Sequence, residues 1–130
     1  MPKKLGIKEG HTVATLNEPK GFGATLGTLP AGTDLVHDLR GHRDVVVVFV
    51  TARAELEKRL AAQSKAIFPD GGLWIAWPKK ASKVPTDITE DVVRAVALPT
   101  GLVDNKVCAI DDVWSGLRLV VRVENRGTRR

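Results

Sequence analysis

The sequence predicts an α/β domain with a mostly parallel sheet and an antiparallel edge, and three observations carry this prediction. Residues 45–50 read Val-Val-Val-Val-Phe-Val, a continuous apolar run typical of a central strand covered on both faces. A segment with helical periodicity, 53–67, separates it from a second apolar run at 73–77. Near the C-terminus, two extended runs joined by a short, turn-rich connection favour an antiparallel pair. This alternation indicates one layered domain.

Shorter elements are expected before the central strand. Residues 11–16 (His-Thr-Val-Ala-Thr-Leu) have the composition of a first strand, and 17–21 (Asn-Glu-Pro-Lys-Gly) interrupt it. Residues 22–29 are expected to form a short helix. A second short strand is expected around Leu35 and Val36.

The helix at 53–67 is expected to begin after Thr51, whose hydroxyl is a suitable N-cap. Its inward face is predicted from helical spacing to contain Leu56, Leu60, Ser64 and Ile67. The turn at 68–72 (Phe-Pro-Asp-Gly-Gly) then leads into the buried strand at 73–77. Within that strand Trp74 and Trp77 are three positions apart, so we expect them on opposite faces of the sheet.

A further helix is predicted from Asp87 to about Leu98, after a lysine-rich loop. Asp87 and Glu90 have the spacing of a capping box, in which each side chain bonds to the other residue's amide. The residues expected to point inward are Ile88, Val92 and Val96.

The two C-terminal strands are expected at 102–110 and 117–123. The connection between them, 111–116, contains Trp114, for which packing over the sheet edge and an exposed partner contact both stay open. Cys108 lies in an apolar strand and is expected to be a buried, inert thiol.

This order of elements resembles the class I methyltransferase variant of the Rossmann-like fold. In that family a helix, a Pro-Asp-Gly-Gly-like turn and a central strand are followed by a helix and a terminal β-hairpin. The resemblance covers roughly 45–123; before that the family has two strands and two helices where this chain has room for less. It implies a single three-layer Rossmann-like domain in shortened form, a mostly parallel sheet with a C-terminal antiparallel β-hairpin.

Five shorter stretches are more specific, and they resemble the bacterial domain of unknown function 3052 family, which has no established activity. They are Leu5-Gly-Ile-Lys-Glu-Gly10, Trp77-Pro-Lys-Lys80, Thr86-Asp-Ile-Thr-Glu-Asp-Val-Val-Arg94, Gly101-Leu-Val-Asp-Asn-Lys-Val-Cys108 and Trp114-Ser-Gly116.

The methyltransferase resemblance implies an S-adenosylmethionine site after the first strand. Glu18, Gly21 and Gly23 match the acidic residue and the glycine turn of that site, and Asp38 is a candidate acid for the ribose hydroxyls. The Pro-Lys pair at 19–20 departs from the pattern, because it fixes the backbone and places a cation near the position of the sulfonium. Two interpretations of this segment stay open: it is a turn that needs a positive φ before a helix, or it is an altered cofactor turn.

A second candidate site lies at the carboxyl ends of the parallel strands, where α/β sheets bind ligands. Asn17, Thr51, Lys79 and Lys80 are expected at this edge and could bind an anion or a partner. The acidic helix start at 87–90 opposes an anion there, so a solvated lysine loop is the simpler alternative.

Length and charge limit the domain organisation and the binding of nucleic acid. The 130 residues fit a single domain, 1–125, followed by a basic tail, 126–130. The net charge of +5 comes from the two ends, because the residues between them carry equal numbers of basic and acidic side chains. The terminal cations are Lys3, Lys4, Lys8, Arg126, Arg129 and Arg130. We therefore expect nucleic acid to bind only weakly, through the tails.

One cysteine and three scattered histidines predict no metal site and a reducing, cytoplasmic location. No signal peptide is expected, and the longest apolar run is too short to cross a membrane. The sequence thus favours a non-catalytic binding or protein-interaction module whose partner is another protein or a second copy. The alternative is an S-adenosylmethionine- or nucleotide-binding enzyme with a degenerate cofactor turn.

Overall fold

The computed structural model describes the backbone of residues 2–126 and the side chains of residues 2–124. A six-stranded sheet runs in the order β2-β1-β3-β4-β6-β5. The elements are α1 (Pro2–Leu5), β1 (Thr12–Leu16), α2 (Phe22–Leu26), β2 (Asp34–Val36), β3 (Val45–Phe49), α3 (Arg53–Ile67), β4 (Gly72–Pro78), the 3-10 helix η1 (Lys80–Ser82), α4 (Glu90–Ala97), the 3-10 helix η2 (Leu98–Thr100), β5 (Leu102–Ala109), β6 (Trp114–Val121) and α5 (Val123–Arg126).

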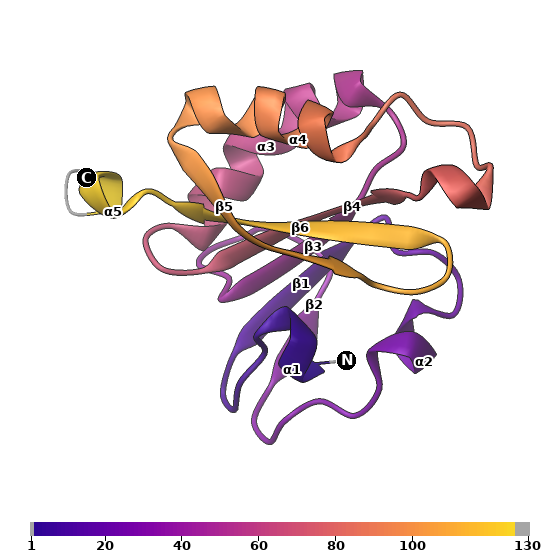
Figure 1. The fold of residues 1–130 in the computed structure, drawn as a ribbon. Coiled ribbons are helices and arrows are strands. Elements are labelled where there is room, and N and C mark those ends of the chain that lie inside the picture. Colours follow the sequence, from indigo (N-terminus) through magenta and orange to yellow (C-terminus); the bar gives the residue numbers. More distant parts are fainter. Residues whose placement is uncertain (1, 127–130) are drawn as a thin grey trace.

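The sheet is mixed, as the sequence predicts. Strands β2, β1, β3 and β4 are parallel, and β6 is antiparallel to both β4 and β5. Helices α3 and α4 cover one face, and the much shorter α1 and α2 lie on the other (Figure 1). The three-layer α/β fold class with a C-terminal antiparallel hairpin is therefore confirmed.

Each face of the sheet has its own apolar core. Trp77 belongs to the core beneath α3 and α4, whereas Trp74 belongs to the core beneath α1 and α2. Both indoles are buried, and Trp74 Nε1 donates a 3.0 Å hydrogen bond to the Leu5 carbonyl, which ties α1 to the sheet. The predicted placement of the two tryptophans on opposite faces is confirmed.

Helix α3 has the predicted bounds but a different cap. Its N-cap is Ala52, whose side chain cannot accept a hydrogen bond, so the prediction that Thr51 caps it is wrong. Asp87 supplies the missing acceptor from 34 positions away, because its Oδ1 lies 2.7 Å from the Arg53 amide nitrogen. The loop before α3 is held further by Thr86 Oγ1, which donates to the Thr51 carbonyl at 2.6 Å.

Helix α4 begins two to three residues later than the capping box predicts. Its N-cap is Thr89, whose Oγ1 accepts from the Val92 amide at 3.2 Å, so Asp87 is not the cap of this helix. Of the three residues predicted to point inward, Ile88 is buried just before the helix and Val96 packs against the same core, as predicted. Val93 and Ala97 are the buried residues of α4, in place of the predicted Val92.

The C-terminal hairpin has a tighter turn than 111–116. Asp111 Oδ1 accepts from the amides of Val113 and Trp114, each at 2.8 Å, and the Ile110 amide donates to the Trp114 carbonyl. Trp114 therefore begins β6 instead of lying in the connection.

Arg126 of the predicted tail lies in α5, and residues 127–130 are outside the described residues. None of the helices described within 2–126 has the length and apolar character needed to cross a bilayer.

Candidate functional site

The chain order of the strands creates a crevice between β1 and β3. From β1 the chain moves outward to β2, and from β3 it moves the opposite way to β4. Ligands of open α/β sheets bind at such a switch point, outside the carboxyl ends of the strands. A cavity of about 410 Å³ lies at this place, and Asn17, Phe49, Thr51, Glu55 and Trp114 are among its lining residues. We call it the switch-point cavity.

Aromatic rings form one wall of the switch-point cavity. The Phe49 ring packs edge-on against Trp114 with 5.0 Å between centroids, and against Phe22 with 4.8 Å. Trp114 is half-buried and packs against the core beneath α1 and α2. Packing of Trp114 over the sheet is therefore confirmed, and its half-buried side chain also lines the cavity. A contact between Trp114 and a partner stays a prediction.

Polar groups at the cavity come from the two strand ends. Asn17 follows β1 with a φ of 58°, a left-handed conformation that Asn tolerates better than most residues. Thr51 follows β3, and its carbonyl is already used by Thr86. Glu55, on the first turn of α3, adds a carboxylate that also pairs with Arg59.

Glu18 is turned back toward its own sheet. Its Oε2 accepts from Thr15 Oγ1 at 2.9 Å and lies 3.0 Å from His37 Nδ1. His37 Nδ1 is also 3.1 Å from Thr15 Oγ1 and 3.2 Å from the Thr15 carbonyl, and Thr15 is only 1% exposed. Glu18 thus closes a polar cluster between the end of β1 and the segment after β2.

The glycines of the cofactor turn have separate roles. Gly21 has a φ of 89° and precedes α2, as a turn that needs positive φ requires. Gly23 lies inside α2, and a Cβ built there meets nothing within 4 Å. The positive φ therefore explains the glycine at 21, whereas neither backbone conformation nor packing requires one at 23.

Asp38 is engaged by two arginines. Arg43 forms an ion pair with its carboxylate and donates through Nε to the Asp38 carbonyl at 3.1 Å, and the Arg40 amide donates to Oδ1 at 3.1 Å. The bond from the Arg40 amide to the carboxylate, followed by that from the Arg43 side chain to the carboxylate, lowers the pKa of Asp38.

The lysine loop is separate from the switch-point cavity. Lys80 lines another cavity, of about 490 Å³, together with Lys83, Thr86 and the floor residue Ile88. Lys79 is not among the lining residues of either cavity, and its amide donates to the Val113 carbonyl at 2.7 Å. The structure therefore brings Asn17 and Thr51 together and places the lysines elsewhere.

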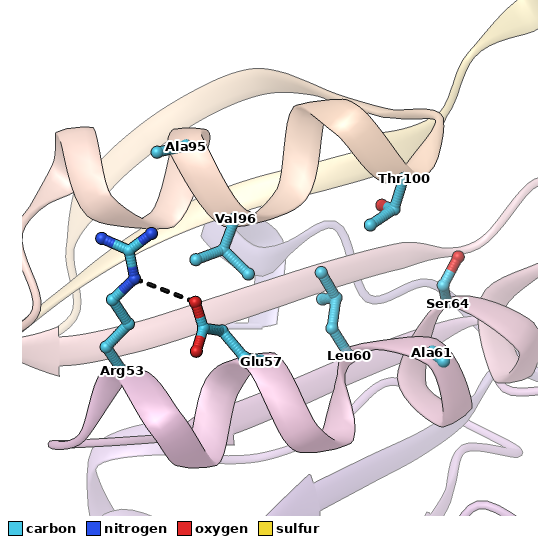
Figure 2. Close-up of a pocket in the computed structure, with 8 residues that line it drawn as sticks. All are labelled: Arg53, Glu57, Leu60, Ala61, Ser64, Ala95, Val96 and Thr100. Atoms are coloured by element: carbon cyan, nitrogen blue, oxygen red, sulfur yellow. Dashed lines mark hydrogen bonds and ion pairs between the residues drawn. The ribbon is translucent and has the colours of Figure 1, made fainter.

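A groove between α3 and α4, of about 530 Å³, is a feature that sequence reasoning missed. Figure 2 shows Leu60 and Val96 facing each other across it, with the ion pair of Arg53 and Glu57 at one end, 3.0 Å between Nε and Oε2. The small side chains Ala61 and Ala95 were the available signal, since they leave space where two helices meet.

Within the part of the chain that the structure describes, no three His, Cys, Asp or Glu side chains are grouped so that they could hold a metal ion. Cys108 is half-buried, where the sequence predicts full burial. Burial raises the pKa of its thiol, and the nearby Lys4 and Lys106 lower it by less.

Comparisons with solved structures identify the fold. A SAM-dependent methyltransferase from Aquifex aeolicus superimposes with a TM-score of 0.68 at 17% identity, over 92% of this chain and 87% of that one. The ribosomal protein L11 methylase of Lactobacillus delbrueckii subsp. bulgaricus gives 0.60 at 12% identity, over 86% and 70%. Magnesium protoporphyrin IX methyltransferase from Synechocystis PCC 6803 gives 0.55 at 12% identity, over 88% and 75%.

No family model matches the chain, the domain of unknown function 3052 included, and no curated protein matches it. At these identities the structural likeness establishes the fold alone. The chain is structurally similar to class I SAM-dependent methyltransferases and has a methyltransferase-like Rossmann fold.

Proposed function

We propose that this chain is a non-catalytic binding module on a methyltransferase-like fold, and that it engages a partner protein at the switch-point cavity. The observation that carries the proposal is the engagement of both candidate cofactor acids by the chain itself. Glu18 is bonded to Thr15 and His37, and Asp38 to Arg43. A ribose held by these carboxylates would have to displace or share those contacts.

Trp114 supports a protein as the partner. Trp side chains contribute a large share of the binding energy at protein interfaces, especially beside a pocket that a partner side chain can fill. Trp114 keeps exposed surface at the rim of such a pocket, and the amide of Asn17 and the hydroxyl of Thr51 supply hydrogen bonds. Glu55 adds negative charge, which disfavours a small anion in this cavity.

The test begins with cross-linking in cells, followed by measurement of Kd with the purified partner. Trp114→Ala should weaken binding by tenfold or more. Val107→Ala is the matched control, because Val107 is an exposed apolar residue of the same hairpin outside this cavity. Trp114→Phe is a second variant that keeps an aromatic ring against Phe49, so it should stay folded if Trp114→Ala does not. A Kd that Trp114→Ala leaves unchanged would contradict the proposal.

A second candidate is an S-adenosylmethionine- or nucleotide-binding domain that uses Glu18, Gly21, Gly23 and Asp38. It is favoured by the position of the cavity at the switch point and by the left-handed turn at Gly21. Because Trp114 lines the cavity while Trp74 and Trp77 are buried, a ligand there should change the fluorescence of Trp114. Titration with S-adenosylhomocysteine tests this candidate, and a flat signal would reject it.

Membership of the domain of unknown function 3052 family and a cytoplasmic location are part of the same proposal. The motif resemblance and the single cysteine support them, and neither adds an activity.

A further inference from the structure

A smaller cavity, of about 220 Å³, lies between α1 and the β5–β6 hairpin. Its lining includes Lys3 and Lys4 of α1, Lys106 of β5 and Arg118 of β6. Arg118 pairs with Trp74 near the amino end of β4, so this cavity is distinct from the switch-point cavity at the carboxyl ends. We call it the basic cavity.

The strand register concentrates positive charge in the basic cavity. Lys106 lies directly opposite Arg118 on the neighbouring antiparallel strand, an arrangement of like charges that destabilises a sheet. The register shifts between Asp104 and Lys106, which skips Asn105 and brings Lys106 into this position. Irregularities of this kind re-aim side chains, often near functional sites.

Gly72 provides the space for the Arg118 guanidinium. A Cβ built on Gly72 would lie 2.5 Å from Arg118 Nε and 2.6 Å from its Nη2. The absence of a side chain on β4 therefore allows the guanidinium to lie against the strand. A substitution at this glycine moves the arginine without removing its charge.

Two of the lysines are held in place by backbone carbonyls. Lys4 Nζ donates to the Ala109 carbonyl at 2.8 Å, and Lys106 Nζ donates to the Lys4 carbonyl at 3.1 Å. An ammonium has three donors, so each keeps two for a ligand. No carboxylate described in residues 2–124 forms an ion pair with Lys3, Lys4 or Lys106.

We propose that the basic cavity binds the phosphate group of a small molecule. Ammonium and guanidinium groups that converge from α1, β5 and β6 match the charge and the acceptor oxygens of a phosphate. The size of the cavity suits one phosphate with a small attached group. A nucleic acid is disfavoured because no aromatic side chain lines the cavity for base stacking.

The experiment measures binding of inorganic phosphate and of glycerol 3-phosphate by calorimetry and by the shift in Tm. Both should raise Tm, and sodium chloride of equal ionic strength should not, because a ligand that binds the folded state stabilises it. Tighter binding of glycerol 3-phosphate points to a phosphorylated metabolite, and equal binding points to the free ion.

Three variants locate the site. Lys106→Ala should weaken binding about tenfold by removing a charged donor. Gly72→Ala should also weaken binding, although the net charge is unchanged. Lys58→Ala is the control, since Lys58 is exposed on α3, which packs on the opposite face of the sheet. Equal losses in Lys58→Ala and Lys106→Ala, or a Tm shift that sodium chloride reproduces, would overturn the proposal.

Discussion

Removing the carboxylate of Asp87 should loosen the start of α3, although Asp87 is close in sequence to α4. Its Oδ1 accepts from the Arg53 amide at 2.7 Å, so Asp87→Ala leaves that amide without its partner. Loss of an N-cap side chain costs about 1 kcal/mol. For a chain of 130 residues, with an unfolding entropy of about 2.1 cal/mol/K per residue, Tm should fall by about 4 °C.

Hydrogen exchange followed by NMR locates the effect. In Asp87→Ala the Arg53 amide should exchange faster, while the Val92 amide, bonded to Thr89, should be unchanged. Thr89→Ala should give the reverse pattern, and Asp87→Asn should keep most of the protection because its side-chain oxygen still accepts. Faster exchange at Val92 in Asp87→Ala would show that Asp87 caps α4 and not α3.

Three other predictions follow from single contacts. In a urea titration, Gly116→Ala should destabilise the protein by about 1–3 kcal/mol, because the added Cβ would lie 3.0 Å from both Ile110 Cδ1 and Trp74 Cε3. Gly23→Ala is the control: its Cβ would meet open space, so the variant should be neutral or stabilising. When the labelling rate of Cys108 is measured against pH, its inflection should lie above the pKa of a free thiol, because burial disfavours the thiolate. Lys106→Ala should move the inflection higher still, because it removes a nearby cation. An inflection at or below the ordinary thiol pKa would contradict this prediction. Because the pKa of Asp38 is lowered in the folded state, the stabilising effect of its carboxylate is present above the ordinary Asp pKa and is lost as the pH falls through the folded-state value. Asp38→Asn should therefore flatten the acid side of the plot of unfolding free energy against pH. An unchanged plot would count against the Arg40 and Arg43 contacts.

The fold could be predicted from the sequence because its main signals are local. The apolar run at 45–50 contains the buried strand β3, and helical spacing gave the bounds of α3. Trp74 and Trp77 alternate as residues of a strand must.

The caps could not be predicted because the partner of the Arg53 amide lies 34 residues away in the chain. A local pattern, the capping box at 87–90, competed with that distant contact and gave the wrong helix start. The inward residue on the first turns of α4 is Val93 and not Val92, whereas Ile88 and Val96 pack against the core as predicted.

Of the candidate sites, the switch-point cavity could be predicted in part and the basic cavity could not. Asn17 and Thr51 were placed by the general rule for strand ends, and both line the switch-point cavity. The basic cavity was not predicted, because the sequence places Lys3 and Lys4 only among the terminal cations, from which weak binding of nucleic acid was expected. Only the register of β5 and β6 brings Lys106 and Arg118 beside them.

Calorimetric titration with S-adenosylmethionine and S-adenosylhomocysteine tests whether this methyltransferase-like fold serves as a binding module without its cofactor. Because Glu18 and Asp38 are engaged by the chain's own residues, we predict no saturable binding of either compound at millimolar concentration. Saturable binding with a micromolar Kd, weakened by Glu18→Gln or Asp38→Asn, would instead establish a cofactor site and contradict a binding module without cofactor.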